Sequence, residues 1–131
     1  MLPQTNTILM KQKIVITDDD PGIQEIYHLI FEKEGYDTVV LPNPKPLLQN
    51  EHQDADIYLL DKQLSGSDGL EICRYLKQNE PTRNKPVIII SANPNARALY
   101  KEAGADDFIE KPFLKKELLA KVANVLMQHS A

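Results

Sequence analysis

Apolar residues occur along this chain in two alternating patterns: short unbroken runs, and longer stretches with helical spacing. The runs are rich in β-branched residues and contain no charge after their first position. Such runs are typical of strands that are buried on both faces of a parallel sheet. The predicted strands are Lys13–Thr17, Thr38–Leu41, Ile57–Leu60, Val87–Ile90 and Phe108–Ile109.

Between the runs, apolar residues recur every three or four positions, which places them on one face of a helix. The prolines fall at the boundaries of these stretches, and Gly35 and Gly104 stand where helices should end. Alternating strands and helices predict an α/β fold with one parallel sheet and helices on both faces. The five predicted helices contain Ile23–Ile30, residues 45–51, Leu70–Leu76, Ala98–Ala103 and Leu114–Leu126.

Composition narrows the function classes. A chain of 131 residues suits one domain, and its net charge of −4 argues against direct binding to a nucleic acid. No apolar run approaches the roughly 18 residues that span a membrane, so we expect no membrane segment. The single cysteine, Cys73, excludes an internal disulfide and favours a reducing, cytoplasmic compartment.

Polar residues follow four of the five predicted strands. Asp18-Asp19-Asp20 follows the first strand, Asp61 the third, Ser91 the fourth and Lys111 the fifth. Ligands of open α/β sheets bind at this edge. Clustered carboxylates repel one another unless a cation compensates, and oxygen ligands favour Mg²⁺. A carboxylate nucleophile beside a metal, a lysine and a hydroxyl can accept a phosphoryl group, and Asp61 is the candidate nucleophile.

Four segments, in order and each at a strand end, resemble the motifs of response-regulator receiver domains, the CheY-like family of two-component signalling. The resemblance covers residues 12–127 and implies a flavodoxin-like sheet of five strands in the order 2-1-3-4-5, with five helices on both faces. The matching segments are Ile14–Pro21, Leu59–Asp61 with Ser67–Leu70, Ile89–Ala92 and Gly104–Phe113.

The resemblance implies a Mg²⁺ site around the phosphorylated residue, Asp61. Asp19 would bind the metal directly, and Asp18 would hold one of its waters. The backbone carbonyl of Gln63 would complete the protein ligands. Asp20, in contrast, precedes Pro21 and is better explained as the N-cap of a helix.

The resemblance also implies a switch. Ser91 would move to bond the phosphoryl group, and Lys111 would pair with it. The Lys111–Pro112 peptide is often cis in the family. Phe108 stands where the family keeps an aromatic residue that turns inward when the hydroxyl moves. Taken alone, Phe108 is better explained as a plain core or rim aromatic residue in the resting state.

The implied function is a phosphorylation-dependent signalling switch that catalyses only its own phosphorylation and dephosphorylation. The phosphoryl donor would be a sensor histidine kinase or a phosphotransfer protein. A downstream protein would bind the fourth helix, fifth strand and fifth helix, around Phe108 and Lys115. We expect residues 1–11 to form a flexible tail, residues 12–129 to form the receiver domain, and no output domain to be present.

An alternative is a phosphohydrolase of the haloacid-dehalogenase type, which also forms an aspartyl phosphate. That class needs Asp-x-Asp-x-Thr/Val, whereas Gly22 stands at the Thr/Val position after Asp18-x-Asp20.

The loop after Asp61 departs from the receiver pattern, with Ser65 and Ser67 in place of a proline and a hydrophobic residue. Two amide side chains, Gln63 and Asn93, border the expected path of the hydrolytic water. The sequence therefore does not predict the lifetime of a phosphoryl group.

Overall fold

Five parallel strands form the centre of the fold, in the order β2-β1-β3-β6-β7. Counted along the chain, this is the order 2-1-3-4-5, so the prediction of a flavodoxin-like sheet is confirmed. The structure is a computed structural model that describes residues 11–61, 63–64 and 67–130. The strands are β1 (Lys13–Thr17), β2 (Asp37–Leu41), β3 (Ile57–Asp61), β6 (Val87–Ser91) and β7 (Asp107–Glu110).

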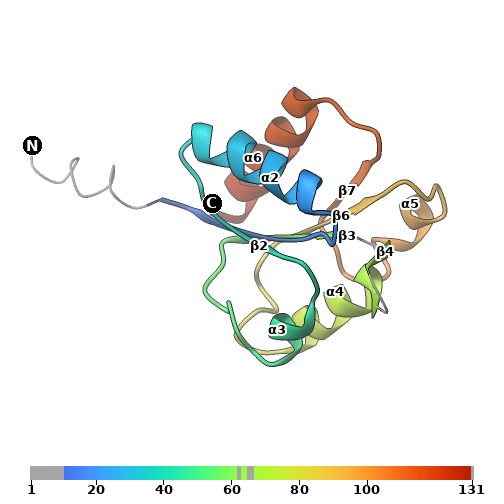
Figure 1. Cartoon of the computed structure of the whole chain (residues 1–131). Coiled ribbons are helices and arrows are strands. Elements are labelled where there is room, and N and C mark those ends of the chain that lie inside the picture. Colours follow the sequence, from blue (N-terminus) through green and yellow to red (C-terminus); the bar gives the residue numbers. More distant parts are fainter. Residues whose placement is uncertain (1–10, 62, 65–66, 131) are drawn as a thin grey trace, which may run out of the picture.

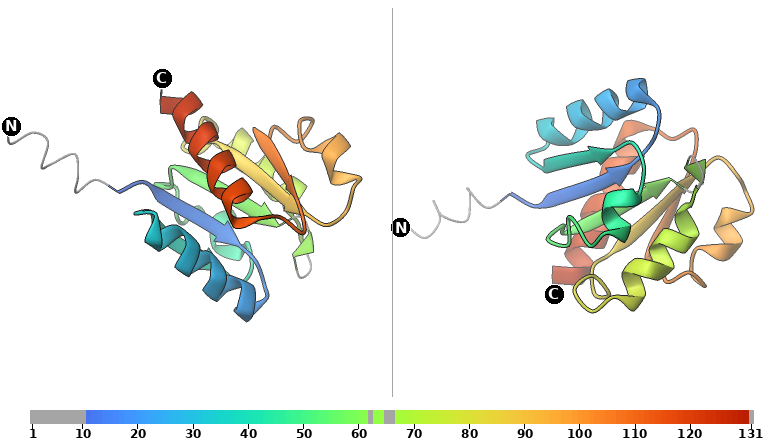
Figure 2. Two further views of the ribbon diagram at one scale, coloured as in Figure 1. Left: turned by 90° about the horizontal axis from the view of Figure 1, so that it is seen from above. Right: turned by 60° about the horizontal axis from the view of Figure 1, so that its bottom comes forward.

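Two layers of helices cover the sheet (Figure 1). The helices α2 (Pro21–Lys33) and α6 (Lys115–Ser130) lie on one face. The opposite face carries three shorter helices, which Figure 2 shows from below. These are α3 (Lys45–Leu48), α4 (Gly69–Gln78) and α5 (Ala96–Leu99).

Two of the five predicted helices are shorter than the apolar spacing indicates. The helix α3 ends at Leu48 instead of residue 51, and α5 covers Ala96–Leu99 instead of Ala98–Ala103. After α5 the chain continues in turns as far as Gly104, which has a φ of +95° that favours glycine. The spacing therefore marks the buried side of the segment correctly, but the helical hydrogen bonding stops early.

A small antiparallel hairpin follows β3 and was not predicted. It consists of β4 (Gln63–Leu64) and β5 (Ser67–Asp68), in which Gln63 pairs with Asp68. Asp68 then caps α4, because its side chain accepts a hydrogen bond from the amide of Leu70 at 2.9 Å. The predicted departure at Ser65 lies outside the described residues.

The sheet separates two apolar cores. In β1, Val15 faces the core beneath α3, α4 and α5, whereas Ile14 and Ile16 face the core beneath α2 and α6. Every residue of β3 and β6 is buried. Burial on both faces explains why these strands read as unbroken apolar runs rather than as alternating patterns.

Candidate functional site

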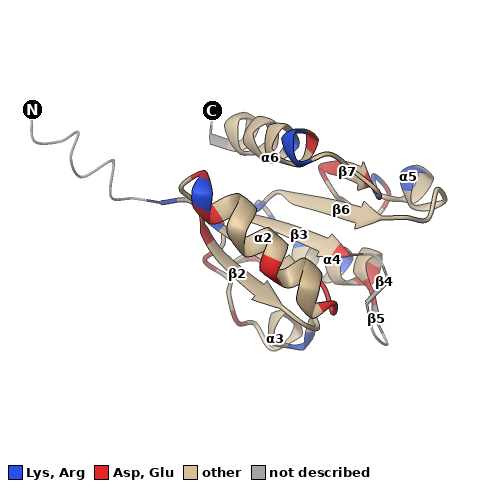
Figure 3. Cartoon of the chain, turned by 45° about the horizontal axis from the view of Figure 1, so that its top comes forward, with Lys and Arg blue, Asp and Glu red and all other residues tan. Residues whose placement is uncertain are grey.

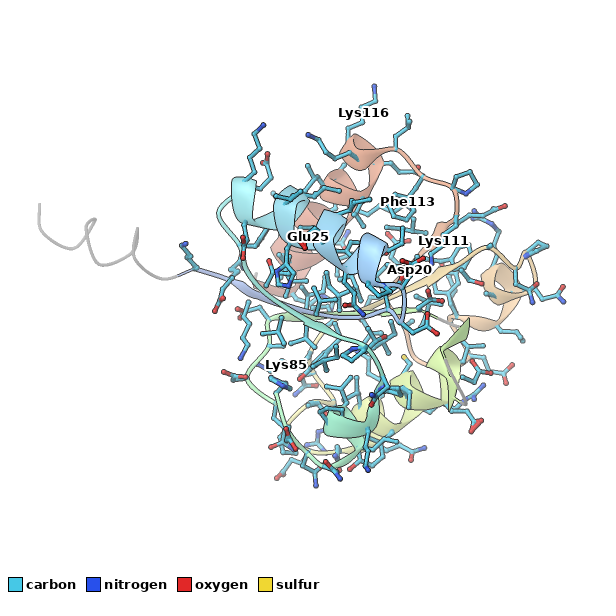
Figure 4. The ribbon with its side chains drawn as sticks, in the orientation of Figure 1. Asp20, Glu25, Lys85, Lys111, Phe113 and Lys116 are labelled. Atoms are coloured by element: carbon cyan, nitrogen blue, oxygen red, sulfur yellow. The ribbon has the colours of Figure 1, made fainter. Side chains whose placement is uncertain are left out.

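The register of the sheet brings the ends of neighbouring strands together. Asp61, the last residue of β3, pairs with Ile90, and Ser91, the last residue of β6, pairs with Glu110. Lys111 follows β7 directly. Figure 4 shows Lys111 beside the start of α2, where Asp20 is labelled. The carboxyl ends of the strands thus bring polar groups together along one edge of the sheet, as predicted. We call this edge the rim.

Two ion pairs made by Lys111 join three of the predicted site residues. The Nζ of Lys111 lies 2.7 Å from Oδ2 of Asp61 and 3.5 Å from Oδ2 of Asp18. The side chains of Asp18 and Asp61 are 3% and 10% exposed, whereas that of Lys111 is 29% exposed. Two nearly buried carboxylates therefore share one partly exposed ammonium group, and the trio has a net charge of −1 when all are ionised.

The loop between β1 and α2 holds Asp18 from several directions. Its Oδ1 accepts a hydrogen bond from the amide of Asp20 at 3.0 Å, and its carbonyl accepts one from Nε2 of Gln24 at 2.7 Å. Asp20 itself caps α2, because its side chain accepts hydrogen bonds from the amides of Gly22 and Ile23. The prediction that Asp20 is a helix cap is confirmed.

Hydrogen bonds donated by backbone amides hold the other strand ends in place. The amide of Asp61 donates to Oγ1 of Thr17 at 3.3 Å, and the amide of Lys111 donates to the carbonyl of Ser91 at 2.9 Å. The hydroxyl of Ser91 is buried and accepts a hydrogen bond from the amide of Asn93 at 2.9 Å. The peptide between Lys111 and Pro112 is cis, as expected from the family resemblance.

Burial and neighbouring charges shift the pKa values of two members of the trio, Asp18 and Lys111. Burial raises the pKa of Asp18, and the nearby charge of Asp61 raises it further, although the Asp20 amide and Lys111 act in the opposite direction. Burial alone would lower the pKa of Lys111. The two carboxylates outweigh this effect, so the pKa of Lys111 lies above its ordinary value.

The carboxylates of the trio also fit a magnesium ion. Mg²⁺ is commonly held by one or two protein carboxylates, with waters and phosphate oxygens completing its shell. Asp18 and Asp61 meet this requirement, and with Lys111 they leave a net negative charge that a cation can offset. Asp19 lies at an exposed position, and the described residues contain no group of three or more His, Cys, Asp or Glu side chains arranged for a metal. Direct ligation by Asp19 and by the Gln63 carbonyl stays a prediction.

Phe108, the predicted switch aromatic, lies inside the protein. Its side chain is buried in the core beneath α4 and α5. The ring of Tyr100 stacks on it with a centroid distance of 5.8 Å, and the guanidinium carbon of Arg97 lies 5.0 Å from its centroid. Sequence reasoning identified Phe108 but did not foresee that Arg97 and Tyr100 cover it.

We expect Asp18→Asn to stabilise the metal-free domain at neutral pH, because burial disfavours the charged form of Asp18. The raised pKa means that the folded state holds the proton of Asp18 more tightly than the unfolded state does. Stability from this group is therefore complete below its ordinary pKa of 3.8 and is lost as the pH rises through the raised value. Asparagine keeps the acceptor for the Asp20 amide without the charge.

Urea unfolding at neutral pH and at the lowest pH at which the domain stays folded measures this effect. The two proteins should differ at neutral pH and converge in acid. A variant that is less stable than the unmodified chain at neutral pH would contradict the electrostatic explanation.

The fold and this rim define the class of protein. The sequence model described as "Response regulator receiver domain" matches residues 14–123, and the chain belongs to this family. It is a signalling domain, and its family is consistent with a phosphorylation-dependent switch, whereas the haloacid-dehalogenase alternative is not favoured.

Individual relatives support the same family. The chain is 34% identical over 116 residues to the DNA-binding response regulator MtrA of Mycolicibacterium smegmatis, covering 86% of this chain and 50% of MtrA. It thus spans about half the length of this relative. Because MtrA is named as DNA-binding, our expectation that nucleic acid is not a partner stays a prediction.

Solved structures with similar folds are receiver domains as well. A CheY-like receiver domain protein from Methanospirillum hungatei aligns with a TM-score of 0.82 and 25% identity, covering 92% of this chain and 98% of its own. A BeF3-activated DrrB receiver domain aligns with a TM-score of 0.78 and 30% identity, covering 90% and 99%. Within the part of the chain that the structure describes, no helix has the length and apolar character needed to cross a membrane.

Proposed function

We propose that Asp61 accepts a phosphoryl group from a phosphohistidine of a sensor histidine kinase or a phosphotransfer protein. The observation that carries this proposal is the contact of Lys111 with the two buried carboxylates, Asp61 and Asp18. A carboxylate oxygen of Asp61 forms the new bond to phosphorus while the bond from phosphorus to the imidazole nitrogen breaks. The nitrogen keeps the electron pair and takes a proton from solvent.

The neighbouring residues divide the work of holding the phosphoryl group. Asp18, Asp19, Asp61 and the carbonyl of Gln63 would hold Mg²⁺, which when bound offsets negative charge on the phosphoryl oxygens. Lys111 already contacts Asp61 and would pair with another of these oxygens. The hydroxyl of Ser91 would leave the amide of Asn93 and donate a hydrogen bond to a third.

An apolar surface beside the rim offers a contact area for the donor protein. A cavity of about 410 Å³ lies between α2 and the connection from β7 to α6, and Lys111 forms part of its wall. Ile26, Leu29 and Leu114 on this side are 49%, 65% and 63% exposed. An apolar cavity with Lys111 in its wall, together with exposed apolar side chains on α2, supports transfer from a protein rather than only from a small molecule.

The output of the switch would be read by a downstream protein on the surface of α5, β7 and α6, around Phe108 and Lys115. We propose that residues 12–129 act as the complete receiver unit, with residues 1–11 outside it. The domain would catalyse only its own phosphorylation and dephosphorylation, and would meet its phosphoryl donor in the cytoplasm.

Incubation with acetyl phosphate and Mg²⁺, followed by intact-mass measurement, tests the proposal. We expect the mass of one phosphoryl group to be added, because the rim supplies a nucleophile and the charges that stabilise transfer. Excess chelator should abolish the adduct, since two carboxylates and one lysine leave the site negative. An adduct that forms equally well with chelator would contradict the role of Mg²⁺.

A further inference from the structure

Two side chains, Arg97 in α5 and Tyr100 directly after it, contact the ring of Phe108. Phe108 is 2% exposed, although it lies in β7, at the edge of the sheet. Tyr100 stacks on the ring with an interplanar angle of 22°. The guanidinium group of Arg97 lies over the ring, at a distance suited to a cation–π interaction. Figure 3 shows the basic part of α5 beside β7.

A carboxylate from β7 holds Arg97 in this place. The Nη2 of Arg97 lies 3.3 Å from Oε1 of Glu110. Both side chains are exposed, at 63% and 49%, so the pair lies on the surface above the ring. Glu110 therefore connects α5 to β7 through Arg97, without burying a charge.

Glu110 also lies next to the residues that would hold the phosphoryl group. It pairs with Ser91 in the sheet and directly precedes Lys111 in the chain. Glu110 is therefore in direct connection with Ser91, with Lys111 and, through its carboxylate, with Arg97. The ion pair between Arg97 and Glu110 therefore connects the rim to the residues that contact the ring of Phe108.

We propose that Arg97 and Glu110 are positioning residues that hold Phe108 inside the protein before any phosphoryl group is attached. The proposal rests on the function proposed above and deepens it, because it names a control on the switch itself. If the phosphoryl group favours the inward ring, then an inward ring favours the phosphoryl group by the same factor. The pair of Arg97 and Glu110 thus sets how readily the domain responds to phosphorylation.

The expected size of the effect follows from the two contacts. An exposed ion pair and an exposed cation–π contact are each weak, and together they shift a two-state equilibrium by about five-fold. A bias of this size adjusts a switch without locking it, because a phosphoryl group that makes several charged contacts can outweigh it.

Fluorine NMR of the whole chain labelled with 4-fluorophenylalanine tests the proposal. The chain has 3 phenylalanines, so the spectrum is simple, and Phe108→Leu identifies the signal of Phe108. Without any phosphoryl mimic, Arg97→Met and Glu110→Gln should shift and broaden this signal, and the double variant should add nothing further. Arg97→Lys keeps a charge and should restore part of the original signal.

Glu110→Gln is the most informative variant, since the ring of Phe108 contacts Arg97 and Tyr100, whereas Glu110 acts on the ring through its ion pair with Arg97. Matched controls are Lys101→Met and Glu102→Gln, two nearby exposed residues that form no ion pair within the described part of the chain. An unchanged Phe108 signal in Glu110→Gln, or an equal change in the controls, would overturn the proposal.

A second measurement uses the phosphoryl mimic BeF₃⁻ with Mg²⁺. Arg97→Met and Glu110→Gln should weaken its apparent affinity by about five-fold, whereas the controls should not. Equal affinities in all variants would overturn the coupling to the rim. Failure of BeF₃⁻ to act on the unmodified chain would instead contradict the proposed function, because the fluorine signal without the mimic does not depend on Asp61.

Discussion

Asp61→Asn should carry no phosphate adduct after incubation with acetyl phosphate and Mg²⁺, under conditions in which the unmodified chain is modified. An uncharged amide is a poor nucleophile and a weak metal ligand, so the variant loses two functions in one step. The change keeps the size of the side chain and removes one of the two carboxylates that share Lys111. Intact mass over time measures the loss, which should be complete.

The matched control is Asp54→Asn. Asp54 also pairs with a lysine, since its Oδ1 lies 3.0 Å from Nζ of Lys13, but it precedes β3 rather than ending it. This variant should be phosphorylated at the rate of the unmodified chain. An adduct that persists in Asp61→Asn would show that another residue is the acceptor.

Lys111→Met should lower the free energy of unfolding by about 2 kcal/mol at neutral pH in the absence of Mg²⁺. The change leaves two carboxylates, 3% and 10% exposed, without their ammonium partner. It should also slow phosphorylation strongly, because the phosphoryl oxygens lose a positive charge. Urea unfolding and the rate of adduct formation measure the two effects separately.

The pH dependence gives a further check on this variant. The pKa of Lys111 is raised, so its stabilising effect is complete below its ordinary value of 10.5 and is lost as the pH rises through the folded value. The difference between variant and unmodified chain should therefore persist from neutral pH to mildly alkaline pH. It should shrink in acid, where Asp18 takes up a proton.

Lys13→Met is the control for stability. The partner of Lys13 is Asp54, whose side chain is 73% exposed, and a pair of this kind contributes less than about 1 kcal/mol. A loss in Lys111→Met no larger than the loss in Lys13→Met would contradict the view that the rim depends on a charged contact in a nearly buried setting.

Much of the fold could be predicted from the sequence because burial on both faces leaves a clear pattern. The unbroken runs Ile57–Leu60 and Val87–Ile90 are strands, and Pro86 directly precedes the second of them. The hairpin formed by β4 and β5 could not be predicted, because strands of two residues show no period. The early end of α5 depends on packing, which spacing alone does not reveal.

Only part of the site could be predicted, because only some of its residues stand at positions that a sequence pattern marks. Asp61 and Lys111 were identifiable because they follow strands, and strand ends converge in a parallel sheet. Thr17 and Gln24 were missed, since their hydrogen bonds to Asp61 and Asp18 use ordinary polar side chains that carry no motif. The one available signal was the hydroxyl of Thr17 at the end of an otherwise apolar run.

The unequal lengths of the helices have a consequence for how rigid each side of the sheet is. One face is covered by helices of 13 and 16 residues, whereas the other carries α4 of 10 residues and two helices, α3 and α5, of only 4 residues each. Opening α5 breaks few backbone hydrogen bonds, so its free energy of local unfolding should be among the lowest in the domain. The domain thus combines a stiff half, which keeps the reactive rim in place, with a compliant half, where a small change in charge can be converted into movement.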